Sequence, residues 1–186
     1  MQIIAAQLTE IPKLYSHFII PYFPENEVKP LNSILDMYSD GCYRVYKLAD
    51  EEKVKAAAFV VVPPDADCVL LDYLAVDAEF QSEGFGGYIL KKLPMLLGEK
   101  TILIETESIE SAANEGQIFE RRRRETFYER AGAKKTEHVT LIFGAEYSIW
   151  TLGAHGIDVL GELRSIYHYM VSGENYDRHV FIPKKA

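Results

Sequence analysis

The sequence has few cysteines and no long apolar segment. Among its 186 residues, Cys42 and Cys68 are the only cysteines, too few for a disulfide framework and too far apart for a C-x-x-C metal or redox motif. The longest apolar run, residues 56–62, is far shorter than the roughly 20 residues that a membrane-spanning helix needs. The first residues carry no basic stretch of the kind that opens a secretory signal. These absences predict a cytoplasmic protein without a membrane span.

Two kinds of catalytic motif are also missing. No G-x-S-x-G segment is present, so the nucleophile turn of the α/β-hydrolases is excluded. The histidines show no spacing typical of metal ligands, and no metal site is expected. They are His17, His138, His155, His168 and His179.

The composition is that of one folded domain with an acidic balance. Hydrophobic residues make up 48% of the chain, charged residues 26%, and the formal net charge is -8. A negative net charge repels phosphate backbones, so nucleic acid is not an expected partner. Residues 1–152 are expected to form the domain itself. Residues 153–186 are expected to add a helix and a tail that pack on this domain or on a partner.

The spacing of apolar residues predicts alternating strands and helices. Expected strands are 2–8, 42–48, 54–62, 69–76, 101–107, 136–143 and 146–152. Expected helices are 12–20, 29–38, 84–97, 117–131 and 156–171, the fourth ended by Gly132. Gly144 and Ala145 should form a hairpin turn, and residues 172–186 an extended tail. The pattern predicts an α/β fold with a mixed, largely antiparallel sheet flanked by helices.

A glycine-rich loop between a strand and a helix is the most informative segment. The strand of residues 70–76 precedes Gln81, Ser82, Glu83, Gly84, Phe85, Gly86 and Gly87, which open the next helix. Free N–H groups and the positive end of the helix dipole converge at such a site, and glycines let a diphosphate approach the backbone closely. We therefore expect a phosphate-bearing ligand here.

Spacing separates the phosphate motifs that could explain this loop. A Walker A loop ends in G-K-[ST], but the first lysine after the glycines is Lys91, which comes too late. A dinucleotide fingerprint needs a small residue where Ile89 stands, and it needs a parallel β-α-β unit rather than a meander. The loop instead matches Q/R-x-x-G-x-G/A at every defined position.

This loop resembles the acyl-coenzyme A loop of the GNAT acetyltransferase superfamily. Residues 127–133, FYERAGA, resemble the F-Y-x-x-x-G-F segment that follows in that family, and the order of elements over residues 2–152 also agrees. The resemblance implies an N-acetyltransferase that moves an acetyl group from acetyl-CoA to a primary amine of a small molecule or peptide. It implies acetyl-CoA as co-substrate and a GNAT-like fold.

The resemblance also implies a set of cofactor contacts. Backbone groups of Leu74, Ala75 and Val76 would hold pantetheine, and residues 81–87 would hold the diphosphate. Arg121 stands where the family often has an asparagine that contacts the cofactor. Residues 121–124 are four consecutive arginines of the expected helix. Arg121 and Arg124 share a helix face with Tyr128, whereas Arg122 and Arg123 are expected to be solvated.

Candidate catalytic residues follow from position and chemistry. Tyr128 occupies the place of a family tyrosine whose phenol can protonate the departing thiolate. The base that takes the proton of the amine is expected to be Asp72, whose apolar neighbours would raise its pKa, with Glu105 as the alternative and Glu107 as a further competitor. The acceptor is expected near Tyr22, Phe23, Glu25 and Glu27, and near residues 144–146.

Two other functions remain open on the sequence alone. One is a sensor that binds acyl-CoA without turnover. The other is a structural subunit that keeps the fold and assembles through the helix of residues 156–171, which is also a candidate surface for a homodimer. Cofactor binding and the release of free coenzyme A in the presence of amines distinguish these functions.

Overall fold

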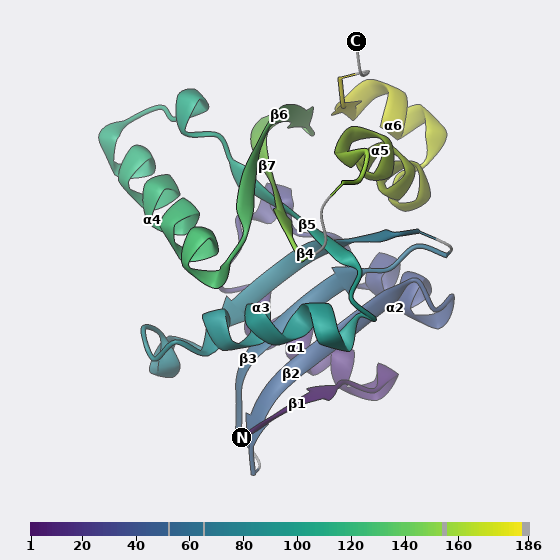
Figure 1. Ribbon diagram of the computed structural model, residues 1–186. Coiled ribbons are helices and arrows are strands. Elements are labelled where there is room, and N and C mark those ends of the chain that lie inside the picture. The colour runs from purple at the N-terminus through teal and green to yellow at the C-terminus, as the bar shows by residue number, and fades with distance from the viewer. Residues whose placement is uncertain (52, 65, 154–155, 184–186) are drawn as a thin grey trace. The chain divides into compact units, whose positions relative to one another are not determined.

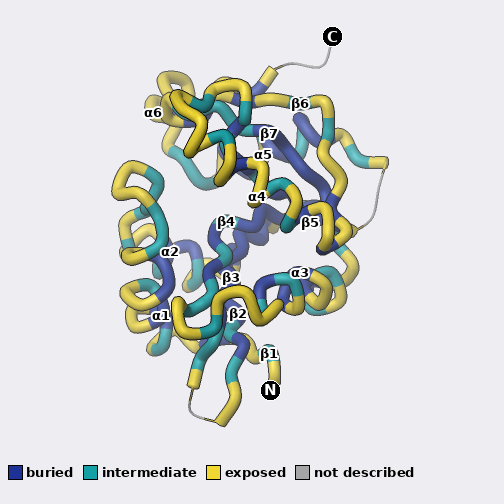
Figure 2. The backbone as a smooth tube through the Cα atoms, turned by 90° about the vertical axis from the view of Figure 1, so that its left-hand side faces the viewer, coloured by how far each residue is buried: buried dark blue, intermediate teal, exposed yellow. Residues whose placement is uncertain are grey.

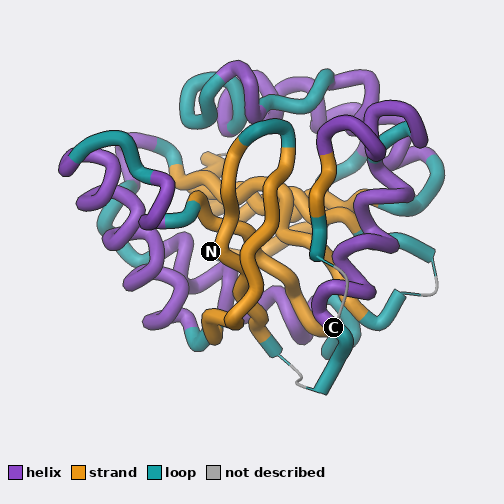
Figure 3. The backbone as a smooth tube through the Cα atoms, turned by 90° about the horizontal axis from the view of Figure 1, so that it is seen from above, coloured by secondary structure: helices purple, strands orange, loops and turns teal. Residues whose placement is uncertain are grey.

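The computed structural model describes residues 1–51, 53–64, 66–153 and 156–183. It divides into two compact units, Met1–Pro64 with Leu71–Lys92, and Asp65–Leu70 with Leu93–Ala186. Each unit combines strands with helices, coloured orange and purple in Figure 3. The predicted α/β fold with a largely antiparallel sheet flanked by helices is confirmed.

The first unit carries the strands β1 to β4 in sequential order. Strand β2 pairs antiparallel with both β1 and β3. The elements are β1 (Gln2–Ala5), η1 (Leu8–Glu10), α1 (Ile11–Phe18), η2 (Glu25–Glu27), α2 (Leu31–Ser39), β2 (Tyr43–Asp50), β3 (Lys53–Val61), β4 (Cys68–Val76), η3 (Ala78–Phe80) and α3 (Phe85–Leu96). The first residues of β4 and the last of α3 belong to the second unit.

Strand β3 is covered on both faces. Each of residues 56–61 is 0% exposed. Successive side chains of a strand point to opposite faces, so burial of consecutive residues requires a layer on each side. Helices α1 and α2 lie on one face of β2 and β3, and α3 lies on the other (Figures 1 and 2). The helices on both faces explain why residues 56–61 form an unbroken apolar run in the sequence.

Helix α1 packs through one apolar stripe. Its buried residues Ile11, Leu14 and Phe18 recur at helical spacing, and Pro12 occupies the first turn, where a missing N–H costs no intrahelical bond. Helix α2 buries Ile34 and Met37. The two helices therefore cover the sheet while the segment between them stays at the surface.

The second unit orders its strands β5-β7-β6-β8, with β7 antiparallel to both β5 and β6. In Figure 1, α4 lies on one side of these strands and α5 and α6 on the other. Helix α4 begins after the capping residue Asn114 and ends, as predicted, at Gly132, whose φ is 96°. The elements are β5 (Thr101–Glu107), η4 (Ile109–Ser111), α4 (Glu115–Ala131), β6 (Lys134–Ile142), β7 (Ala145–Leu152), α5 (Val159–Met170), α6 (Gly173–His179) and β8 (Val180–Phe181).

The hairpin turn lies one residue earlier than predicted. Phe143 and Gly144 have φ of 47° and 83°, and Ile142 pairs with Ala145. Two central residues with positive φ are typical of a type I′ turn, which matches the twist of paired strands. The sequence signal came from glycine alone, whereas the structure places an aromatic residue at the first left-handed position.

The prediction of an extended tail is wrong for residues 173–179, which form α6. Tyr176 is buried, and its ring stacks on His168 of α5 with 3.6 Å between centroids. This contact gives the short helix a tertiary anchor that local sequence does not reveal. Only Val180–Phe181 is extended, paired with β6, and residues 184–186 lie outside the described residues.

Trp150 anchors the core of the second unit. The ring is 0% exposed, and its Nε1–H donates to the buried Thr106 Oγ1 at 2.9 Å. Thr106→Val should lower the free energy of unfolding by about 1–3 kcal/mol, because it leaves a buried donor without its acceptor. In a Trp150→Phe background the same change should be nearly neutral. Denaturation followed by circular dichroism measures both, and equal costs in the two backgrounds would contradict this role.

Candidate functional site

The end of β4 exposes one row of residues. Asp72, Leu74 and Val76 are partly exposed, whereas Tyr73 and Ala75 are buried. The Asp72 side chain itself is only 5% exposed, so much of this residue's exposed surface is backbone. Exposed backbone along a strand can pair with an extended ligand. The pantetheine assignment of residues 74–76 stays a prediction.

A short turn leads from β4 to the glycine loop. Asp77 caps η3 by accepting from the Glu79 N–H at 2.9 Å, and it also pairs with Nε2 of His17. These hydrogen bonds, that of the Glu79 backbone first, lower the pKa of Asp77. Tyr22 OH accepts from the Ala78 N–H at 2.7 Å. Helix α1 and the residues after it therefore hold the turn in place.

The glycine loop is open to solvent and begins a helix as predicted. Residues 81–84 are exposed, and α3 starts at Phe85. Ser82 and Gly84 have φ of 69° and 86°, which re-aims the backbone at the helix start. A Cβ built on Gly84 or Gly87 meets no atom within 4 Å. The N–H groups of a first helical turn have no partner within the helix, and such groups can bind an anion.

Side chains of β3 and of the loop's own flanks line this site. Phe80 and Phe85 pack edge to face, with centroids 6.1 Å apart. Lys55 Nζ lies 5.0 Å and 5.1 Å from their ring centroids, and Lys53 Nζ lies 4.9 Å from Phe80. Lys53 Nζ also pairs with Glu79 at 2.7 Å and Lys55 Nζ with Asp50 at 3.6 Å, so both ammonium groups near the loop are already in ion pairs. Sequence reasoning missed both lysines, because they come from another strand and belong to no motif.

Asp72 has surroundings that differ from those expected. Its Oδ1 accepts from Lys29 Nζ at 2.6 Å, and its Oδ2 accepts from Tyr43 OH at 2.5 Å. The expectation of apolar neighbours around this carboxylate is therefore wrong. Burial of Tyr43, together with the charge of Asp72, raises the pKa of the phenol well above its ordinary value. Asp72 is a paired carboxylate with a donor on each oxygen.

The other catalytic candidates belong to the second unit. Glu105 is partly exposed on β5, and its Oε2 accepts from Tyr167 OH of α5 at 2.6 Å. Tyr128 lies in the last turns of α4 and is buried. Burial raises the pKa of Tyr128 to about 12, although the Arg124 charge opposes this shift. The phenol is therefore protonated throughout the neutral range, as a proton donor must be.

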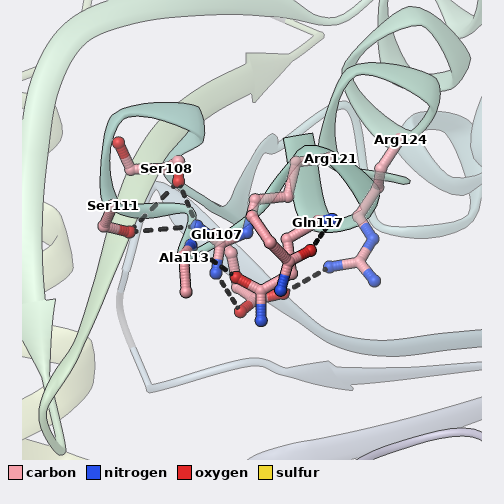
Figure 4. Close-up of polar contacts among 8 residues, drawn as sticks. Glu107, Ser108, Ser111, Ala113, Gln117, Arg121 and Arg124 are labelled. Atoms are coloured by element: carbon pink, nitrogen blue, oxygen red, sulfur yellow. Dashed lines mark hydrogen bonds and ion pairs between the residues drawn. The ribbon is translucent and has the colours of Figure 1, made fainter. Parts of the chain in front are cut away.

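Arg121 connects α4 to the end of β5 (Figure 4). The residue is buried; Nη1 donates to Ser108 O at 2.5 Å and to Ser111 Oγ at 3.1 Å, and Nη2 donates to Glu107 Oε1 at 2.7 Å. Arg124 contacts the other Glu107 oxygen at 3.4 Å. Arg121 and Arg124 thus share a face, as predicted. The guanidinium of Arg121 holds the turn after β5, and its cofactor contact stays a prediction.

Neither a metal cluster nor a membrane span is found in the part of the chain that the structure describes. No three His, Cys, Asp or Glu side chains there are grouped so that they could hold an ion, and His155 lies outside the described residues. None of the described helices has both the length and the apolar character needed to span a bilayer.

Comparison with solved structures identifies the fold. The sequence matches no family model and no curated protein. A Bacteroides thetaiotaomicron protein assigned to the GNAT acetyltransferase family aligns at a TM-score of 0.68 and 17% identity, over 91% of this chain and 96% of its own. The Escherichia coli ribosomal-protein-S18-alanine N-acetyltransferase aligns at a TM-score of 0.55 and 19% identity, over 84% of this chain and 97% of its own.

A third structure, a Bacillus subtilis acetyltransferase in complex with CoA, aligns at a TM-score of 0.57 and 16% identity, over 83% of this chain and 99% of its own. Identities this low establish the architecture and leave the chemistry to the site. The strand, glycine loop and helix described above are the elements on which the sequence resemblance was based. The chain has the fold of the GNAT acetyltransferases.

Proposed function

We propose that this protein is an N-acetyltransferase that transfers the acetyl group of acetyl-CoA directly to a primary amine of a small molecule or peptide. The observation that carries the proposal is the open anion site at the start of α3, where the exposed loop of residues 81–84 precedes the first helical turn. The coenzyme A bound by one fold neighbour supports it.

The residues of the first unit fit the co-substrate. Residues 81–87 would hold the diphosphate through backbone N–H groups, and the space beside Gly84 leaves room for its oxygens. Lys53 and Lys55 lie near the loop and are paired with Glu79 and Asp50. The backbone of residues 74–76 would bind the pantetheine arm. The thioester supplies an activated acetyl group. The chain has to bind it, orient the amine and move two protons.

Proton transfer needs one acceptor and one donor. The amine must lose a proton to attack the carbonyl carbon, and Glu105 is the carboxylate that we assign to this step, directly or through water. Asp72 is less suited, because Lys29 and Tyr43 bind its two oxygens. Tyr128 would protonate the departing sulfur and then take up the second proton that the nitrogen loses as the amide forms. The raised pKa of the phenol keeps its proton available at neutral pH.

Acetyl-CoA should stabilise the folded protein, because the anion site exists only when strand, loop and helix are assembled. At a hundredfold excess over the dissociation constant, the gain should be about 2.7 kcal/mol. Thermal unfolding with acetyl-CoA, NADH and ATP measures this, and the latter two should have much smaller effects. An unchanged melting temperature in saturating acetyl-CoA would refute the proposal. Binding without release of coenzyme A across a panel of amines would instead indicate a sensor.

Gly84→Ala should weaken acetyl-CoA binding by tenfold or more, because the added methyl group would occupy the space assigned to the diphosphate oxygens. A tenfold loss corresponds to about 1.4 kcal/mol. Gly41→Ala is the matched control, because both glycines are exposed, have φ of 86° and 77°, and offer open space to a Cβ. Both variants should lose roughly 1–2 kcal/mol of stability from the left-handed backbone. Calorimetric titration measures affinity. The same affinity in both variants would contradict the loop assignment.

Tyr128→Phe should lower kcat by roughly 10²–10⁴-fold and leave the affinity for acetyl-CoA unchanged, since only the proton donor is removed. The raised pKa of Tyr128 means that the phenol deprotonates only near pH 12. The loss should therefore be the same factor at every pH from about 6 to 9, giving parallel rate profiles. Tyr169→Phe, an exposed tyrosine of α5, is the control. Wild-type turnover in Tyr128→Phe would exclude the phenol as the acid.

A further inference from the structure

The segment that joins α1 to α2 is fixed at its end by an unusual set of hydrogen bonds to one lysine. The backbone N–H of Lys29 donates to Tyr73 OH at 2.9 Å, and the backbone oxygen of Lys29 accepts from Tyr15 OH at 2.9 Å. Tyr73 OH in turn donates to the Glu27 carbonyl at 2.9 Å. Both backbone groups of Lys29 are thus bound by tyrosines, and one of these tyrosines belongs to β4.

The side chain of Lys29 makes the third attachment. Its Nζ lies 2.6 Å from Asp72 Oδ1 and 5.4 Å from the centroid of the Tyr73 ring. The Lys29 side chain is 28% exposed, whereas that of Asp72 is 5% exposed, so the ion pair is weakly screened on the carboxylate side. Tyr43 OH donates a hydrogen bond to the other carboxylate oxygen of Asp72, Oδ2. Each oxygen of this carboxylate thus has a donor from a different element.

The same segment is attached to β4 and its following turn near its start. Tyr22 OH accepts from the Ala78 N–H, and the Phe23 ring packs edge to face on Tyr73, with centroids 4.9 Å apart. Residues 22–29 are therefore attached to Ala78 through Tyr22, and to Tyr73 and Asp72 through Phe23 and Lys29. Between these points lie residues 74–76, to which the proposed function assigns the pantetheine arm. Contacts within the first unit thus bring the segment expected to meet the amine onto the strand expected to meet the cofactor.

We infer that Asp72 is a positioning residue that fixes residues 22–29 through Lys29, and that it is not the base of the reaction. The inference rests on the proposed function, since the segment matters to catalysis only if an amine binds beside it. The pair sets the place of η2, which carries Glu25 and Glu27. Its loss should therefore affect the affinity for a cationic amine more than the rate of the chemical step.

A double-mutant cycle of Asp72→Asn and Lys29→Met tests this role. Each single variant should raise KM for the amine by about tenfold, with kcat within about threefold and acetyl-CoA affinity unchanged. The double variant should be no worse than the worse single variant, because both changes remove the same interaction. Lys29→Arg, which keeps the charge, should restore most of the wild-type KM. Additive losses would overturn the coupling.

The pH profile separates positioning from base catalysis. If Asp72 acts only through Lys29, Asp72→Asn should keep the acidic limb of kcat/KM. Two results together would make Asp72 the base and overturn the inference. Asp72→Asn would lower kcat by about 100-fold or more, and it would abolish the acidic limb both in the wild-type background and in the Lys29→Met background. Lys29→Met alone leaves a buried charge and can unfold the chain, but the double variant removes both charges and keeps the comparison available.

Hydrogen exchange gives a readout that needs no turnover. Amides of residues 22–29 should exchange faster in both single variants than in the wild type, while those of β3 should not change. Unchanged exchange in residues 22–29 would overturn the inference whatever the kinetics. If the wild type transfers no acetyl group to any amine, that result alone overturns the proposed function, and the exchange data still decide whether Asp72 holds the segment through Lys29.

Discussion

The start of α3 imposes the constraint from which the site follows. A helix leaves the N–H groups of its first turn without internal partners, and a dipole concentrates positive charge there. In most helices a side chain or water satisfies these groups. Here the preceding residues are exposed, Ser82 and Gly84 take positive φ, and the space beside Gly84 is open. The local structure favours a ligand that brings its own negative oxygens.

Strand β4 connects the glycine loop to the other parts of the first unit. Its partly exposed residues alternate with buried ones, so one row is accessible while Tyr73 and Ala75 hold the strand in the core. Tyr73 also binds the backbone of residues 27 and 29. A single strand thus supports two surface segments, the glycine loop after it and the connection between α1 and α2. A structural change in either segment therefore acts on the backbone of β4, which supports the other segment as well.

Much of the fold and of the loop could be predicted, because both depend on local pattern. Periodic apolar residues gave the strands and most helices, and the spacing of Gly84 and Gly86 separated one phosphate loop from its competitors. Contacts between distant residues could not be predicted in the same way. Lys29 lies 43 residues before Asp72, and nothing in either local sequence indicates that they pair. The expected apolar setting of Asp72 was wrong for this reason.

The choice of base illustrates the same limit. Alternation along a strand places a carboxylate on a face, but its basicity depends on the donors that reach it from other elements. Asp72 and Glu105 look alike in sequence, each an acidic residue in an apolar strand. In the structure both residues are partly exposed. Asp72 accepts hydrogen bonds from Lys29 and Tyr43, and Glu105 accepts one from Tyr167. The ion pair with Lys29 and the hydrogen bond from Tyr43 hold the Asp72 side chain in place. The burial and pairing of Asp72 therefore favour a structural carboxylate, and for this reason the proposed function assigns the proton transfer to Glu105.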